Sequence, residues 1–470
     1  MRKEGPAVNA LFPMLTSAAV KQRAIVWING LRSRAARLRS NSFVRKVGIL
    51  SGGSALGHAF TLAAAPFLTR IYGPRDFGAL GLFSSFLNVV SVAVALRYEI
   101  SIPSGKDEDE AAYLTLFSLI LALPMGVLAA GLLWVLIHSS ILGFGGLPWY
   151  TPLLLALAMG FVGIFTALRY WCLRRGRFDQ ISQGVVVQSA GRALFQTAIG
   201  AVGFHSAGLL CGEVLGRGFG MSRMFRTSWP HIQRCVRAFH WKDFSGALWR
   251  NRKFPLYSLP SGLLDSLAAS LSVPLLIRLY GDTVGGHYSL VWKAITVPSV
   301  LLTVAIADTF HSHLANCARE EPHHVARLFK RTSLALLLLG GIPALILWFW
   351  GVPLFRVVFG SEWALSGAMA AIIAPWYLAD FVYVPVSRVV LVLSGQEWKL
   401  ILDAMGVASL LTVFFVVQWR GIAPMQTIKT LAVVSVGLRL FSFAILSRIV
   451  ARFERTRAGK SPGCLIPVLD

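Results

Sequence analysis

The chain has 470 residues, of which 55% are hydrophobic and only 14% are charged. Soluble domains carry about 25% charged residues, so this composition excludes an ordinary soluble protein and indicates an integral membrane protein. The formal net charge of +24 would favour a nucleic-acid ligand in a soluble chain. Here the basic residues follow the pattern of cytoplasmic membrane loops, so no nucleic-acid partner is expected.

The first 46 residues form a basic segment without the long apolar run of a signal peptide. Residues 17–40 fit a basic helix lying on anionic lipid headgroups, and they fit a disordered basic tail equally well. We predict that this segment is cytoplasmic in either case.

Twelve stretches beyond this segment are apolar enough to cross a bilayer, which takes roughly 20 residues of helix. The sixth is the weakest because it contains Glu213 and Arg217, and a buried or partly re-entrant segment fits it as well. The expected fold is therefore an all-α membrane protein of about 12 transmembrane helices. The stretches are 47–69, 77–97, 113–137, 149–171, 184–204, 206–222, 255–277, 284–307, 332–355, 364–393, 400–418 and 424–447.

An internal repeat relates the first of these stretches to the seventh. Residues 66–73 (PFLTRIYG) return as residues 274–281 (PLLIRLYG), an offset of 208 with five identities. The register continues, so that Gly78 corresponds to Gly286. Such a repeat predicts two six-helix bundles in parallel orientation around a central cavity, which is typical of transporters. A chance likeness between apolar segments is the alternative.

Basic residues alternate between the successive loops of the chain. Most of the 45 lysines and arginines lie in the termini and the even-numbered loops. Since positive loops stay in the cytoplasm, we expect both termini there and an even number of spans. The odd-numbered loops hold only Arg70, Arg75, Arg278, Arg356 and Arg420.

The predicted organisation has five parts. A basic cytoplasmic segment (1–46) precedes the first six-helix bundle (47–222). A cytoplasmic linker (223–253) carries eight basic residues and separates the two bundles. The second bundle (254–447) is followed by a basic cytoplasmic tail (448–470).

Several segments resemble the polysaccharide-transporter, or O-antigen flippase, family. They are residues 66–83, which include the repeat, and residues 95–114, 253–281, 288–310 and 354–367. This family belongs to the superfamily that also holds multidrug exporters and the lipid II flippase. The resemblance covers roughly residues 45–450 and implies two six-helix bundles, alternating access and a lipid-linked oligosaccharide as cargo. It also implies the bacterial inner membrane, and surface polysaccharide such as O-antigen, capsule or exopolysaccharide as the product.

Basic residues inside the apolar stretches are the candidate substrate ligands. Charge within a membrane is costly and is functional by default, and guanidinium groups grip phosphate in bidentate fashion. A cationic cavity would therefore suit the undecaprenyl diphosphate of such a cargo. A structural ion pair or a side chain snorkelling to the interface is the alternative for each. The candidates are Arg192, Lys293 and Arg439, with Arg97 and Arg388 nearer the ends of their stretches.

Three of the acidic residues within the stretches are the candidates for ion coupling: Asp265, Asp380 and Glu213. Asp265 lies in the middle of the seventh stretch and could bind H+ or Na+, or pair with one of the cations above. Asp380 and Arg388 share a helix face but are too far apart for a direct pair, so each needs another partner.

The sequence offers little support for catalysis. It contains no Walker A motif, no GxSxG or HExxH motif and no clustered metal ligands, so we expect no metal and no cofactor beyond an ion gradient. The outward loops are short, which argues against a membrane glycosyltransferase or ligase. A multidrug or small-cation exporter of the same superfamily is the other alternative, and its site should be acidic and aromatic. Other polysaccharide assembly proteins are possible partners.

Overall fold

In the computed structural model, residues 42–237, 240–320, 322–393 and 396–458 are described. These residues are almost entirely helical and contain no strand. The basic segment 17–40 and the end of the predicted tail lie outside the described residues. An all-α membrane fold, as predicted, is therefore confirmed.

The first half of the described chain contains six α-helices. Each coincides with one of the first six apolar stretches. Asp107 caps the third of them, since its Oδ1 accepts a 2.7 Å hydrogen bond from the backbone N–H of Glu110. The helices are α2 (Ser42–Ile71), α3 (Pro74–Ser91), α4 (Glu108–His138), α5 (Thr151–Arg174), α6 (Phe178–Ala201) and α7 (His205–Arg217), with 3-10 turns η1 (Tyr98–Ser104) and η2 (Ile141–Gly146) between them.

Two further helices, α8 (Ser222–Arg237) and α9 (Trp241–Arg250), lie in the predicted linker. The buried carboxylate of Glu110 in α4 attaches this region to the first half. It accepts hydrogen bonds from Arg250 Nε at 3.2 Å and from Asn251 Nδ2 at 3.0 Å. The linker is thus packed against the helices and is not a free loop.

The second half continues from α10 through α17. The seventh apolar stretch is divided between α10 and α11, which are bent by 42°. Pro274 favours the bend, because proline cannot donate to the carbonyl of Ser270 four residues earlier. The elements are η3 (Phe254–Ser258), α10 (Leu259–Ser270), α11 (Ser272–Tyr280), α12 (Asp282–Glu320), η4 (Pro322–His324), α13 (Val325–Phe359), η5 (Ser361–Trp363), α14 (Ala364–Val386), α15 (Val389–Val392), α16 (Gln396–Arg420) and α17 (Pro424–Ala458).

Six helices within the described ranges are long and apolar enough to cross a membrane, or seven if the bent pair counts as one span. All twelve predicted stretches fall on helices, but the remaining ones do not meet this test on their own. Helix α7 has 13 residues and is therefore about 20 Å long, shorter than the roughly 30 Å of a hydrocarbon core. The protein is a multi-pass membrane protein, and the count of twelve crossings stays a prediction.

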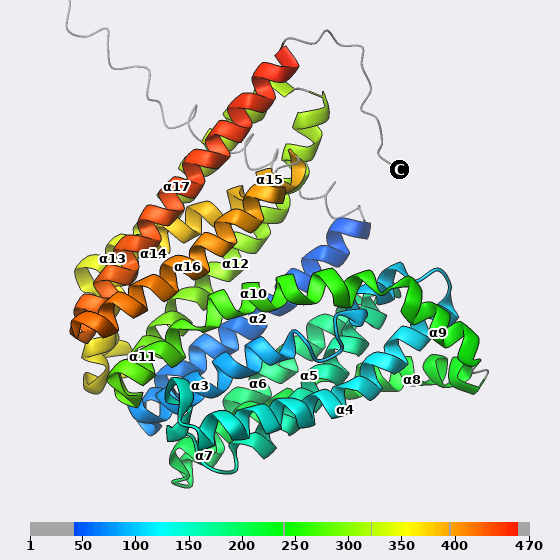
Figure 1. Cartoon of the computed structure of the whole chain (residues 1–470), viewed down its shortest axis with the longest axis horizontal. Helices are drawn as coiled ribbons and strands as arrows, with labels where there is room; N and C mark the ends of the chain where they lie inside the picture. Colours follow the sequence, from blue (N-terminus) through cyan, green and yellow to red (C-terminus); the bar gives the residue numbers. More distant parts are fainter. Residues whose placement is uncertain (1–41, 238–239, 321, 394–395, 459–470) are drawn as a thin grey trace, which may run out of the picture.

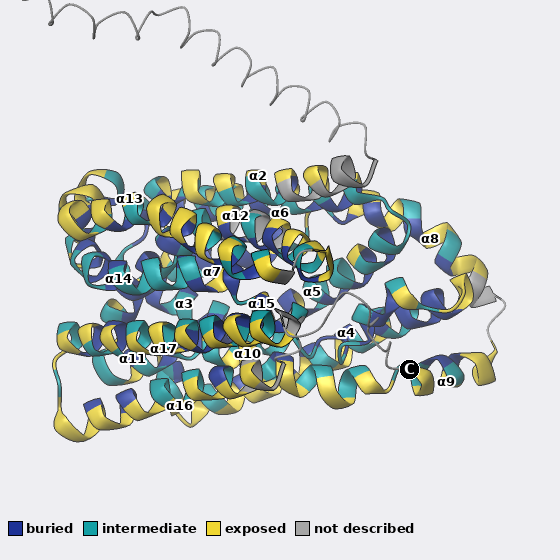
Figure 2. Ribbon diagram, turned by 90° about the horizontal axis from the view of Figure 1, so that it is seen from above, coloured by how far each residue is buried: buried dark blue, intermediate teal, exposed yellow. Residues whose placement is uncertain are grey.

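The two halves meet at one end of the molecule and diverge toward the other (Figure 1). Helices α3 and α11 lie at the end where they meet, whereas α9 and α15 lie at the opposite end. Exposed residues dominate the outer faces of helices such as α13 and α16, and buried residues face inward (Figure 2). Between the halves, α3 packs on α12, and Trp363 Nε1 donates a 3.0 Å hydrogen bond to the carbonyl of Thr69.

The repeated tyrosines occupy matching places in the two halves. The Tyr72 hydroxyl donates to the carbonyl of Gln196 at 2.7 Å and also lies against the start of α7. The Tyr280 hydroxyl donates to the carbonyl of Ile422 at 2.6 Å, between α16 and α17. Each tyrosine therefore ties the end of its repeat segment to the last helical hairpin of its own half.

Candidate cation cluster and acidic pocket

A cluster of charged side chains forms where α7 packs on α6. Glu213 is at its centre, with a side chain only 6% exposed. Its Oε1 accepts from Arg217 at 2.8 Å and from Arg192 at 3.3 Å. Its Oε2 accepts from Gln196 Nε2 at 3.3 Å. We call Arg192, Arg217, Glu213 and Lys293 the cation cluster.

Glycines on α7 bring this cluster together. Gly208, Gly212 and Gly216 recur at every fourth position and so share one helix face. A Cβ atom at Gly212 would collide with Gln196, and one at Gly216 would collide with Arg192. Small residues in this spacing let membrane helices approach closely. The close approach of the charged side chains on α6 and α7 therefore depends on a glycine packing motif that is visible in the sequence.

Lys293 adds a cation from the second half. It lies on α12, near enough for its charge to act on Glu213, although no ion pair of Lys293 within 4 Å is found among the described residues. The hydrogen-bonded members of the cluster therefore lie on α6 and α7 of the first half, and Lys293 contributes its charge from α12 of the second. With three cations and one carboxylate it has a formal charge of +2, which favours an anionic ligand.

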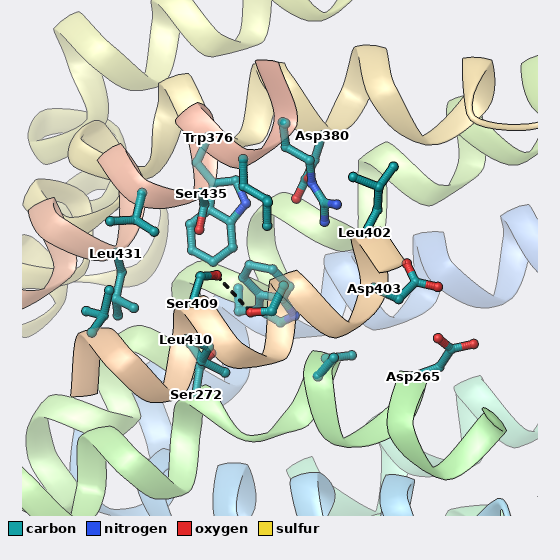
Figure 3. A pocket seen from close by; sticks show the side chains of 18 residues that line it. Asp265, Ser272, Trp376, Asp380, Leu402, Asp403, Ser409, Leu410, Leu431 and Ser435 are labelled. Atoms are coloured by element: carbon teal, nitrogen blue, oxygen red, sulfur yellow. Dashed lines mark hydrogen bonds and ion pairs between the residues drawn. The ribbon is translucent and has the colours of Figure 1, made fainter. Parts of the chain in front are cut away.

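The second half contains a separate pocket of 290 Å³ between α10, α14, α16 and α17 (Figure 3). Its lining includes Asp265, Asp380 and Asp403. In Figure 3, Asp380 and Asp265 project from opposite sides, with Asp403 between them in the view. The pocket is also aromatic, because Trp292 and Trp376 line it with ring centroids 5.4 Å apart. We call it the acidic pocket.

Asp380 forms an ion pair with Arg439 of α17. The guanidinium of Arg439 also lies over the Tyr383 ring, 4.9 Å from its centroid. The partner that Asp380 was predicted to need is therefore Arg439. Asp265 is an exposed residue that faces the pocket. No group of three or more His, Cys, Asp or Glu side chains in the described chain is placed to hold a metal ion.

Arg97 lies outside both sites, in the turn after α3. Its backbone is left-handed, with φ of 67°. Its guanidinium packs against Gly262 of α10, where a Cβ atom would collide with it. Its Nε atom is buried and has no hydrogen-bond partner within the described ranges. Arg97 therefore links the two halves, whereas Arg388 is exposed between α14 and α15.

Six of the eight predicted site residues thus fall into two groups instead of one cavity, and Arg97 and Arg388 belong to neither. Arg192, Lys293 and Glu213 belong to the cation cluster, and Asp265, Asp380 and Arg439 belong to the acidic pocket. Sequence reasoning did not select Arg217 and Asp403 as site residues. The signals were present, because each lies inside a predicted apolar stretch and Arg217 follows the glycine motif.

The family of this chain follows from its match to a protein-family model. A family model described as "Polysaccharide biosynthesis protein" matches residues 67–367. The chain belongs to this family. The match covers residues 67–73 of the first repeat segment, the whole second repeat segment and the cation cluster, so the resemblance seen in the sequence is confirmed. No curated protein matches the chain.

Solved structures share the fold of this polysaccharide biosynthesis family member at low identity. The inward-facing conformation of a multidrug resistance MATE family transporter of the MOP superfamily has a TM-score of 0.64 at 15% identity, covering 86% of this chain and 96% of that one. The lipid II flippase MurJ in an inward closed conformation gives 0.62 at 12% identity, covering 87% and 90%. The outward-facing conformation of a MATE family transporter gives 0.51 at 14% identity, covering 87% and 96%. The family member therefore has the fold of membrane transporters and flippases.

Proposed function

We propose that the protein is a flippase that moves an undecaprenyl-diphosphate-linked oligosaccharide across the bacterial inner membrane. The observation that carries this proposal is the cation cluster. Arg192 and Arg217 around one carboxylate, with the positive charge of Lys293 nearby on α12, suit a strongly anionic group. The membership of the polysaccharide biosynthesis family supports a glycan as the rest of the cargo.

The chemistry of the cluster suits a diphosphate. Arginine donates two parallel hydrogen bonds to phosphate oxygens, and lysine adds a point charge. A charged head group loses its hydration when it passes the hydrocarbon region, and fixed cations would replace part of that hydration. Arg97, at the junction of the halves, and Arg388, exposed at the end of α14, are further proposed contacts along the route.

Alternating access is the proposed mechanism. The halves meet near α3 and α11 and diverge at the other end, as in Figure 1. The higher TM-score against the inward-facing than against the outward-facing MATE conformation, 0.64 against 0.51, supports an inward-open state. The bend between α10 and α11 provides a position at which the second half could rearrange. Both termini are then cytoplasmic, and each half supplies six spanning helices.

The acidic pocket is the proposed site of ion coupling. Asp265 and Asp403 face it, and Asp380 is already paired with Arg439. A proton or a sodium ion bound there would be the only cofactor. The same pocket favours the second candidate function, a multidrug or small-cation exporter, because it is both acidic and aromatic.

Purified protein in liposomes distinguishes the two candidates. A fluorophore-labelled, undecaprenyl-diphosphate-linked oligosaccharide is placed in both leaflets, and a membrane-impermeant reductant then destroys the accessible label. In protein-free vesicles, the fluorescence of the inner leaflet is protected from the reductant. If the protein is a flippase, vesicles that contain it should lose this protected fluorescence as well. Unchanged protection, together with uptake of an organic cation such as ethidium, would establish the exporter instead.

A further inference from the structure

Glu213 occupies the place that an anionic ligand of the cation cluster would take. Its Oε1 receives hydrogen bonds from both Arg192 and Arg217. A carboxylate oxygen between two guanidinium groups is a close chemical analogue of a phosphate oxygen in the same position. The cluster is therefore already bound to an anion, which is part of the protein itself.

The two arginines nevertheless keep unused donors. The Nε atoms of Arg192 and Arg217 are both buried and lack a hydrogen-bond partner among the residues that the structure describes. A buried donor without a partner is costly, so it favours any ligand that supplies an acceptor. Glu213 has only two oxygens and cannot satisfy both guanidinium groups. A diphosphate has enough oxygens to do so.

A neutral donor stands on the other side of Glu213. Gln196 Nε2 lies 3.3 Å from Oε2 and also donates to the carbonyl of Leu209 at 3.3 Å. The carboxylate can therefore turn away from the arginines and keep a hydrogen bond. It need not leave the cluster when another anion takes its place.

We propose that Glu213 is an internal counter-ion, which the diphosphate of the cargo displaces and which expels the diphosphate by pairing again with the arginines. This inference rests on the proposed function and adds a mechanism of release to it. Without the exchange, a site of three cations would hold its cargo tightly. Transport requires that the cargo can dissociate again. Because Glu213 is always beside the site, it competes with the bound diphosphate for the arginines and so promotes dissociation.

The inference predicts that removing the carboxylate strengthens anion binding. Glu213→Gln keeps the size of the side chain and changes the formal charge of the cluster from +2 to +3. Loss of this negative charge removes both the competing carboxylate and its repulsion of a bound anion. We therefore expect inorganic pyrophosphate to bind the variant at least about fivefold more tightly than it binds the wild type.

The experiment is calorimetric titration of the full chain in detergent with inorganic pyrophosphate. The matched control is Glu110→Gln. Glu110 is also a buried carboxylate with an arginine partner, Arg250, but it lies at the linker and outside the cluster. Its variant should bind pyrophosphate as the wild type does. Thermal unfolding of both variants checks that each is folded.

Two further variants separate the inference from a general effect of charge. Arg217→Gln should weaken pyrophosphate binding. The double variant Glu213→Gln/Arg217→Gln has the wild-type formal charge but lacks both the competitor and one guanidinium, so its affinity should fall between those of the single variants. Glycan flipping by Glu213→Gln in liposomes should be slower than in the wild type, because release is impaired.

Each outcome bears on one of the two proposals. Tighter pyrophosphate binding with slower flipping supports the counter-ion. Unchanged or weaker pyrophosphate binding by folded Glu213→Gln overturns the counter-ion proposal. If Glu213 only held the arginines in place, its loss would disorder the site and lower its affinity for pyrophosphate. If neither the wild type nor Glu213→Gln binds pyrophosphate, the counter-ion is overturned as well. The proposed function then depends on the flipping of the lipid-linked oligosaccharide by the wild type, which is measured separately.

Discussion

Gly78 and Gly286 are equivalent positions in the repeat, and they lie at the point where α3 crosses α12. Gly78 of α3 packs against α12, and Gly286 of α12 packs against α3. A Cβ atom at Gly78 would collide with the carbonyl oxygen of Asp282, and one at Gly286 would collide with that of Pro74. Asp282 is itself the repeat counterpart of Pro74, 208 residues later. The contact is therefore reciprocal, as in a two-fold interface between identical subunits. This reciprocity makes a chance likeness of the two segments a poor explanation.

The crossing predicts that Gly286→Ala destabilises the protein. The new methyl group must displace backbone, and overpacking of this kind costs about 1–3 kcal/mol. Thermal unfolding in detergent measures the effect. The control is Gly437→Ala in α17, where the Cβ atom meets open space and the gain in helix propensity is about 1 kcal/mol. A melting temperature of Gly286→Ala at or above that of the wild type would contradict the close packing.

Tyr72 and Tyr280 hold equivalent positions in the repeat, so removing either hydroxyl should destabilise the protein by a similar amount. Tyr72→Phe and Tyr280→Phe each remove a hydroxyl that bonds to the last hairpin of its half. Each loss should cost about 0.5–1.5 kcal/mol, more if the carbonyl stays buried and unpaired. Tyr257→Phe is the control, because that residue is 74% exposed. If only one of the two variants lowers the melting temperature, the tyrosines do not have equivalent roles.

The topology prediction concerns the loops between the helices. Reporter fusions should read cytoplasmic at Gln233, in α8, and external at Gly145 and Gly421. The reason is the alternation of basic residues along the chain. An external reading at Gln233 would invalidate the division into six and six spans, and the parallel repeat with it.

The fold was largely predictable because it depends on composition and length. Each apolar stretch coincides with a helix or a bent helix pair, and the predicted weakness of the sixth stretch is matched by the short helix α7. The bend between α10 and α11 was not predictable in detail, because Pro66 occupies the equivalent position in α2 without dividing that helix. Neighbouring helices decide whether a proline breaks a membrane helix.

The candidate site was predictable as a set of residues but not as an arrangement. Arg192 and Glu213 are 21 residues apart on different helices, so no helical spacing relates them. Only the close approach of α6 and α7 at Gly212 and Gly216 joins them. From its sequence position alone, Arg439 is expected beside Arg192 in one cationic cavity. Its pairing with Asp380 places it in another pocket, because tertiary packing selects its partner.

The acidic pocket predicts a difference between two aspartates. Asp265→Asn should leave the protein folded and leave substrate binding largely intact, but it should reduce accumulation driven by an ion gradient, because it removes a titratable group. Asp380→Asn should instead destabilise the protein, because it breaks a half-buried ion pair with Arg439; the cost should stay below the about 3–5 kcal/mol of a fully buried pair. Transport with and without an imposed gradient, beside thermal unfolding, measures both. Loss of Asp265→Asn from the membrane would indicate a structural role.

The central claim is that the cation cluster grips the phosphates of a lipid-linked glycan, and substitution of its cations tests this claim most directly. The measurement is glycan delivered to the cell surface, normalised to the amount of protein in the membrane. Arg192→Ala and Lys293→Ala should each lower delivery about tenfold or more, since hydrogen bonds to charged groups contribute about 1.5–3 kcal/mol. Arg192→Lys should retain part of the activity, because the charge persists without the bidentate geometry. Full delivery by both alanine variants at normal protein level would contradict the claim.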